Sequence, residues 1–114
     1  MQTIGKKGEE EAARFLKQEG FEILEKNYRF KRSEIDLICK GSDTLIFVEV
    51  KTRSSSAFGE PETFVSESQQ NSIIRAAEQF IEENQWQGDI RFDVIAILKT
   101  KGSFELEHFK DAFY

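Results

Sequence analysis

Two segments of the chain repeat apolar residues at the three- to four-residue spacing of an amphipathic helix. The first predicts a helix over residues 8–19 that stops at Gly20. The second predicts a helix over residues 67–84, with Ser66 and Gln69 as a capping box at its start.

Other segments have the residue pattern of strands, in which successive residues point to opposite faces. They predict five strands, over residues 21–30, 34–40, 45–51, 91–98 and 104–108. The second and third are apolar on both faces, which is typical of central strands. Residues 53–65 hold the only proline and are expected to form an exposed loop. The order α-β-β-β-α-β-β predicts one domain over residues 1–114, a mixed α/β sheet flanked by helices.

The two central strands carry charged residues among their apolar ones. Residues 41–44 have the composition of a hairpin turn. A hairpin closed there would place Asp36 opposite Glu49, and Glu34 opposite Lys51. Charges in an apolar setting are costly unless something pairs with them. A divalent cation and a phosphate are partners that would satisfy this set of charges.

Opposed carboxylates on paired strands have Cβ atoms about 4.5–5.5 Å apart, so Asp36 and Glu49 can share one Mg²⁺. The carbonyl of Val50, between Glu49 and Lys51, can add a ligand. Lys51 projects to the same face, within reach of a phosphate oxygen or an attacking water. Hydrolysis of a phosphodiester requires a barrier reduction of about 8–23 kcal/mol, which these side chains cannot supply without a cation. The pattern favours metal-dependent hydrolysis with Asp36 and Glu49 as ligands and Lys51 as charge stabiliser.

The alternative is a salt bridge between Lys51 and a carboxylate of the second strand on a solvent-exposed face. The remaining chemically active residues have structural interpretations. His108 is expected to be structural or on the surface, and Cys39 to belong to the core. Asp93 is expected to pair with Arg91 or to cap a neighbouring element, with contact to the site as the less favoured option.

Composition and charge indicate which partners and which cellular location to expect for the protein. The net charge is −5, yet the first 53 residues carry 11 Lys and Arg against 10 Asp and Glu. This distribution is consistent with a local cationic groove on an otherwise acidic protein, and equally with ordinary surface lysines and arginines. One cysteine, no apolar signal segment and no long apolar run predict a cytoplasmic protein that does not enter membranes.

Several short motifs resemble a known family. Ser33-Glu-Ile-Asp36 and Phe47-Val-Glu49-Val-Lys51-Thr-Arg53 resemble the Asp…Glu-x-Lys motif of restriction-endonuclease-fold nucleases. The wider set that resembles the small YraN-type family is Gly8-Glu9-x-x-Ala12, Asn27-Tyr-Arg29, Gly59-x-Pro61, Ala76-Ala77 and Arg91-Phe-Asp93. This resemblance covers nearly the whole chain.

The resemblance implies a restriction-endonuclease-like fold with a Holliday-junction-resolvase-like core. It implies a DNA endonuclease, acting on branched or damaged DNA, that uses Mg²⁺ or Mn²⁺. The catalytic residues would be Asp36, Glu49 and Lys51, with Glu9 on the first helix as a fourth acidic member. Resolvase-like nucleases often form homodimers, so a dimer is an option here. The alternative is a non-catalytic nucleic-acid-binding or adaptor protein that keeps the fold.

The basic residues nearest to this motif are the candidates for phosphate contact. They are Arg29, Lys31, Arg32 and Arg53. Family members usually carry Lys near Gln69 and Gly in place of Ser33. A glutamine can still hydrogen-bond a phosphate, so Gln69 joins the predicted nucleic-acid-binding residues.

Overall fold

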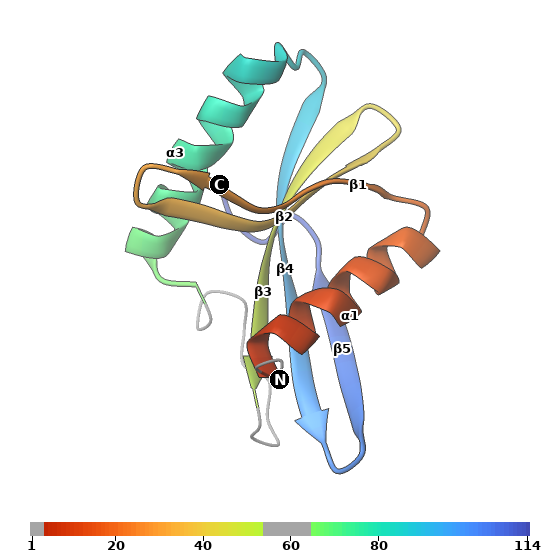
Figure 1. The fold of residues 1–114 in the computed structure, drawn as a ribbon. Coiled ribbons are helices and arrows are strands. Elements are labelled where there is room, and N and C mark those ends of the chain that lie inside the picture. The colour runs from red at the N-terminus through yellow and green to blue at the C-terminus, as the bar shows by residue number, and fades with distance from the viewer. Residues whose placement is uncertain (1–3, 54–64) are drawn as a thin grey trace.

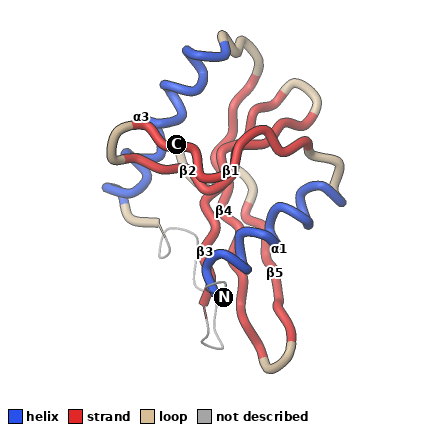
Figure 2. The backbone as a smooth tube through the Cα atoms, viewed as in Figure 1, coloured by secondary structure: helices blue, strands red, loops and turns tan. Residues whose placement is uncertain are grey.

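A computed structural model gives the fold of the chain over residues 4–53 and 65–114. Its elements are α1 (Ile4–Gln18), β1 (Glu22–Phe30), β2 (Ser33–Gly41), β3 (Thr44–Arg53), α3 (Glu67–Asn84), β4 (Asp89–Thr100) and β5 (Ser103–Phe109), as Figures 1 and 2 show. The predicted α/β class and order of elements are confirmed. Most of the expected loop over residues 53–65 lies outside the described residues, but Arg53 ends β3 and Val65 is buried.

The five strands form one sheet in the order β1-β2-β3-β4-β5. Strands β3 and β4 are parallel, and the other neighbours are antiparallel. A parallel pair needs a long crossover connection, and α3 lies in the connection between β3 and β4. Helices α1 and α3 lie on opposite sides of the sheet, and the β1–β2 turn reaches across to α3 (Figure 1).

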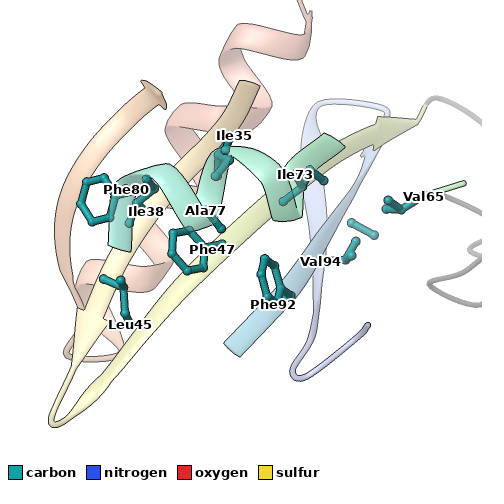
Figure 3. Close-up of a cluster of buried hydrophobic side chains, with 12 residues drawn as sticks. Ile35, Ile38, Leu45, Phe47, Val65, Ile73, Ala77, Phe80, Phe92 and Val94 are labelled. Carbon is teal, nitrogen blue, oxygen red and sulfur yellow. The ribbon is translucent and has the colours of Figure 1, made fainter. Parts of the chain in front are cut away.

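Each helix covers its own hydrophobic core. On the α3 side, Phe47 stacks on Phe92 with ring centroids 5.3 Å apart and meets the edge of Phe80 at 6.2 Å (Figure 3). On the α1 side, Ala12 and Leu16 pack against apolar residues of β2, β3 and β4. In the described part of the chain, neither helix is long and apolar enough to cross a membrane.

The turn between β2 and β3 sets the register of the two central strands. It is tighter than the predicted four-residue loop, because Gly41 already pairs with Thr44 and only two residues separate them. Ser42, the first of these, has the positive φ of 53° that tight hairpin turns use. The register itself is the predicted one, and its ladder runs as far as the pair Leu37 and Val48.

The start of α1 differs from the prediction. The helix begins at Ile4 and not at Gly8, so no acidic residue lies in its first turn. Gly8 is interior to the helix and buried against β3. A Cβ there would lie 2.1 Å from Oγ1 of Thr52, so this glycine permits close packing. Gly20, with φ of 96°, follows the end of the helix as predicted.

Candidate active site

An open pocket of about 390 Å³ lies beside β2 and β3, just beyond the last residues of their ladder, and faces the start of α3. We call it the carboxylate pocket. Its lining residues are Glu9, Arg32, Glu34, Asp36, Glu49, Val50, Lys51, Gln69, Ser72 and Ile73. It therefore contains four carboxylates and two cations, drawn from α1, the β1–β2 turn, β2, β3 and α3.

Asp36 and Glu49 form the buried centre of the pocket, with 9% and 8% of their surfaces exposed. They occupy the strand positions directly after the pair Leu37 and Val48, so the predicted juxtaposition is present. The two side chains share a hydrogen bond. The backbone N–H of Val50 also donates to Oδ2 of Asp36, at 2.8 Å. The Asp36 carboxyl is thus held at the junction of the two strands.

The pKa of Asp36 is raised to about 8, mainly by burial and then by the hydrogen bond and negative charge of Glu49. The N–H of Val50 and the charge of Lys51 oppose the rise. Two carboxylates so close together cannot both ionise easily. At neutral pH the pair therefore retains a proton, which a cation bound between them would replace.

Two donors converge on the other side of Glu49. Lys51 Nζ lies 3.6 Å from Glu49 Oε2, and Gln69 Nε2 donates to the same oxygen at 3.0 Å. Lys51 lies two residues beyond Glu49 on β3 and so projects to the same face. Ser66 caps α3, and its Oγ accepts from the N–H of Gln69 at 3.1 Å. The predicted capping box is only half formed, because the Gln69 side chain turns to Glu49 and not back to Ser66.

Glu9 reaches the pocket from α1. Its partial burial raises its pKa, and the charges of Asp36 and Glu34 raise it further. A side-chain hydrogen bond with Asn27 on β1 lowers the pKa. Asn27 has a left-handed φ of 54°, a conformation that asparagine tolerates better than most residues. Asn27 therefore holds Glu9 in place, a role that its occurrence in Asn27-Tyr-Arg29 did not indicate.

The other basic residues predicted near the site differ in where they lie. Arg32 lines the carboxylate pocket, whereas Arg29, Lys31 and Arg53 are not among its described lining residues. Arg29 is 70% exposed at its side chain and pairs with Glu34 at 3.4 Å. Lys31 Nζ lies over the Phe30 ring, 5.2 Å from its centroid. Arg53 Nη1 donates to the carbonyl of Thr52 at 3.2 Å.

The ion pairs also differ from those considered for the hairpin. Lys51 pairs with Glu49 and not with Asp36 or Glu34, and Glu34 pairs with Arg29. The Lys51 and Glu49 side chains are only 18% and 9% exposed, so this pair does not lie on a solvent face. Its partial burial makes it part of the pocket and not an ordinary surface salt bridge.

Two pocket residues from α3 were missed. Ser72 and Ile73 follow Gln69 by three and four residues, so all three lie on one side of the helix. Ser72 Oγ lies 2.7 Å from Ser33 Oγ and joins α3 to the start of β2. Helical spacing from Gln69 could have identified both residues, had the docking of α3 been known.

Asp93 belongs to a second buried cluster on the α1 side of the sheet. Its carboxylate accepts from Arg91 Nε at 2.9 Å and Nη2 at 2.8 Å, as predicted, and lies 2.7 Å from Nε2 of His108. Asp93 pairs in register with Val48, so its side chain lies on the opposite face from Glu49. His108 is thus structural, and Cys39 is buried in the α1 core.

The oxygen ligands of the carboxylate pocket suit a hard divalent cation that takes only a few of its ligands from the protein. Among the described residues, no group of three or more His, Cys, Asp and Glu side chains could hold a metal ion. Mg²⁺ commonly binds through one or two carboxylates and keeps several waters. Asp36 and Glu49 match that requirement, and Val50, which also lines the pocket, could add its carbonyl.

The fold and the pocket define an α/β domain with two buried, adjacent carboxylates beside a lysine. The chain belongs to the Uncharacterised protein family UPF0102, the YraN family, whose sequence model matches residues 8–97. The family predicted from the motifs is confirmed.

Relatives share most of their length with this chain. A UPF0102 protein of Christiangramia forsetii is 45% identical over 111 residues, which cover 97% of this chain and 93% of the relative. A UPF0102 protein of Geotalea daltonii is 47% identical over 113 residues, which cover 97% and 89%. A third, UPF0102 protein FP2501 of Flavobacterium psychrophilum, is 42% identical over 97% and 93% of the two chains.

Proposed function

We propose that this protein is a metal-dependent nuclease with a restriction-endonuclease-like core, which hydrolyses phosphodiester bonds in DNA. The observation that carries the proposal is the buried contact between Asp36 and Glu49 with Lys51 beside it. Folding brings two carboxylates together at a cost, since both are buried and the charge of Glu49 disfavours ionisation of Asp36. Such an arrangement is typical of a site whose partner is a cation.

The side chains of the pocket divide the work of phosphate hydrolysis. Asp36, Glu49 and the Val50 carbonyl would hold Mg²⁺ or Mn²⁺. Bound there, the cation would polarise the phosphate and lower the pKa of an attacking water. Lys51 would stabilise charge on the phosphate oxygens, and Glu9 would accept a proton at the rim of the pocket.

Gln69 and Arg32 would contact the phosphate at the edges of the pocket. Gln69 supplies an uncharged N–H donor, and Arg32 supplies the guanidinium that suits phosphate geometry. A second candidate function is nucleic-acid binding or an adaptor role without turnover. The neutral Gln69 and the excess of carboxylates in the pocket weaken attraction for a polyanion, and so favour the adaptor role over DNA cleavage.

Thermal melting with and without Mn²⁺ tests the metal site. Mn²⁺ is expected to raise the melting temperature of the wild-type protein, because a ligand that binds only the native state stabilises it. Asp36→Ala should abolish the rise, whereas Glu78→Gln on the exposed face of α3 should keep it. An unchanged wild-type melting temperature would refute the metal site.

Cleavage of a branched DNA separates the nuclease from the binding protein. Activity should require Mn²⁺ or Mg²⁺ and disappear in Lys51→Ala, while Lys40→Ala, a lysine of β2 outside the pocket, should retain it. DNA binding with a metal-dependent melting shift but no cleavage would favour the non-catalytic function. Equal cleavage by wild type and Lys51→Ala would indicate a contaminating nuclease.

A further inference from the structure

A second pocket, of about 360 Å³, adjoins the carboxylate pocket at the β1–β2 turn. We call it the flanking pocket, and its lining residues are Phe30, Lys31, Arg32, Ser33 and Arg75. It combines three cations with one aromatic ring, on a protein whose net charge is −5. Neither Phe30 nor Arg75 belongs to the site described above.

The two pockets are physically continuous. Arg32 lines both of them. The hydroxyls of Ser33, in the flanking pocket, and Ser72, in the carboxylate pocket, lie 2.7 Å apart and so join the two walls. Along α3, Gln69, Ser72 and Arg75 follow one another at three-residue spacing, and therefore one side of the helix passes along both pockets. A chain-like ligand in the first pocket would continue into the second.

The charges of the flanking pocket are available to an anion. Within the described part of the chain, no ion pair joins Lys31, Arg32 or Arg75 to a carboxylate. Arg75 and Arg32 extend from α3 and from the turn, two separate elements, so a phosphate between them would be contacted from both sides. This contrasts with Arg29, whose guanidinium is already paired with Glu34.

The aromatic ring suits a base. Phe30 is half-buried and packs partly on the core below α3, which fixes its position. The ammonium of Lys31, an exposed and flexible side chain, lies over the ring at 5.2 Å from the centroid. A base can displace that ammonium and stack on the ring, and Lys31 is then free to contact a phosphate.

From these contacts we infer that the flanking pocket binds an unpaired nucleotide next to the phosphate in the carboxylate pocket. The base would lie on Phe30, and the adjoining phosphate would lie between Arg32 and Arg75. Inside a duplex, base faces are stacked on one another, and exposing one costs energy that an unpaired nucleotide does not require. The preferred substrate class is therefore DNA with an unpaired nucleotide, an inference that rests on the proposed function.

Fluorescence anisotropy with labelled DNA tests the inference on the full chain. The probes are a duplex and the same duplex with one unpaired thymidine, both measured in EDTA to prevent cleavage. Wild type is expected to bind the second probe more tightly. Phe30→Leu, which keeps an apolar side chain in the core but lacks a ring, should lose that preference, by about 5- to 150-fold in affinity for the unpaired probe.

Arg75→Ala should weaken binding to both probes and reduce the salt slope by about one, as expected for one lost phosphate contact. The matched controls are Phe104→Leu on β5 and Arg14→Ala on α1, which should leave affinity and preference unchanged. Equal wild-type affinity for the two probes, or wild-type behaviour of Phe30→Leu and Arg75→Ala, would overturn the inference.

The Mn²⁺ melting shift distinguishes the two failures. If the shift and metal-dependent cleavage remain while the preference for an unpaired nucleotide is absent, only the flanking pocket has been misassigned. If wild type shows neither a melting-temperature shift nor cleavage, the proposed nuclease function fails together with the assignment of the flanking pocket.

Discussion

Gln69 on α3 donates a hydrogen bond from Nε2 to Oε2 of Glu49 on β3 at 3.0 Å, across twenty positions of sequence. The same oxygen faces Lys51 at 3.6 Å, and Glu49 in turn contacts Asp36. Residue 69 therefore adjusts the electrostatics of the carboxylate pair without belonging to it. A neutral amide satisfies Glu49 but does little to favour ionisation of the pair.

Replacing Gln69 with charged residues should change the pH dependence of stability in opposite directions. A lysine at 69 would favour the ionised carboxylates and lower the pKa of Asp36, so Gln69→Lys should show a smaller fall in melting temperature between pH 5 and pH 8. Gln69→Glu should show a larger fall, because a third carboxylate raises that pKa further. The same pair of substitutions at exposed Gln87 serves as control. Identical pH profiles for both Gln69 variants and wild type would exclude this electrostatic coupling.

Asp36 itself should make the protein less stable as the pH rises. Its pKa is raised from 3.8 to about 8 in the native state, so between those values the native protein binds a proton that the unfolded chain releases. Stability then falls with rising pH across this window. Asp36→Asn keeps an oxygen for the Val50 N–H and removes the titration. Its melting temperature should exceed that of wild type at pH 8 and converge with it near pH 4.

Thermal melting across this pH range in the absence of divalent cations checks the prediction. Glu78→Gln, an exposed carboxylate on α3, should follow the wild-type profile. A wild-type melting temperature that rises steadily between pH 4 and pH 8, with Asp36→Asn in parallel, would contradict the raised pKa.

The central hairpin could be predicted from sequence because its determinants are local. The turn after Gly41 and the alternation of apolar residues fix the register of β2 and β3, and the register in turn places Asp36 beside Glu49. Lys51 follows from the two-residue period alone. These relations need no knowledge of how distant elements pack.

Contacts made by helix docking could not be predicted in this way. The Gln69–Glu49 hydrogen bond, the Ser33–Ser72 contact and the position of Arg75 depend on how α3 sits on the sheet. The sequence pattern defines only the apolar side of a helix, not its partners. The pairing of Glu9 with Asn27 depends likewise on the docking of α1.

Gly8, predicted as the first residue of the first helix, lies inside α1 and lets the helix approach Thr52. Gly8→Ala improves helix propensity and yet should destabilise the protein by about 1–3 kcal/mol, because the new methyl group overlaps Oγ1 of Thr52. Urea unfolding measures the change. Thr52→Ala removes that oxygen, so the double variant Gly8→Ala/Thr52→Ala should recover stability relative to Gly8→Ala. A stabilising Gly8→Ala would show that the helix does not pack this closely.

The buried carboxylate of Asp93 should respond to pH in the sense opposite to Asp36. Burial alone would raise its pKa, but the hydrogen bonds with His108 and Arg91 and from the Asp111 N–H lower it overall. Its stabilising contribution is thus present above the unfolded pKa of 3.8 and is lost as the pH falls through the native value. This cluster holds β5 and the C-terminal turn against β4.

Asp93→Asn should therefore cost about 3–5 kcal/mol of unfolding free energy at pH 7, because it leaves the Arg91 guanidinium without its counter-charge. The difference from wild type should shrink as the pH falls below 3.8, because the unfolded wild-type chain then binds a proton that the native Asp93 carboxylate still excludes. Urea unfolding at pH 7 and at pH 3 measures both effects. Asp43→Asn, in the exposed β2–β3 turn, should stay within about 0.5 kcal/mol of wild type. If Asp93→Asn did the same at pH 7, the ion cluster would contribute little to the fold.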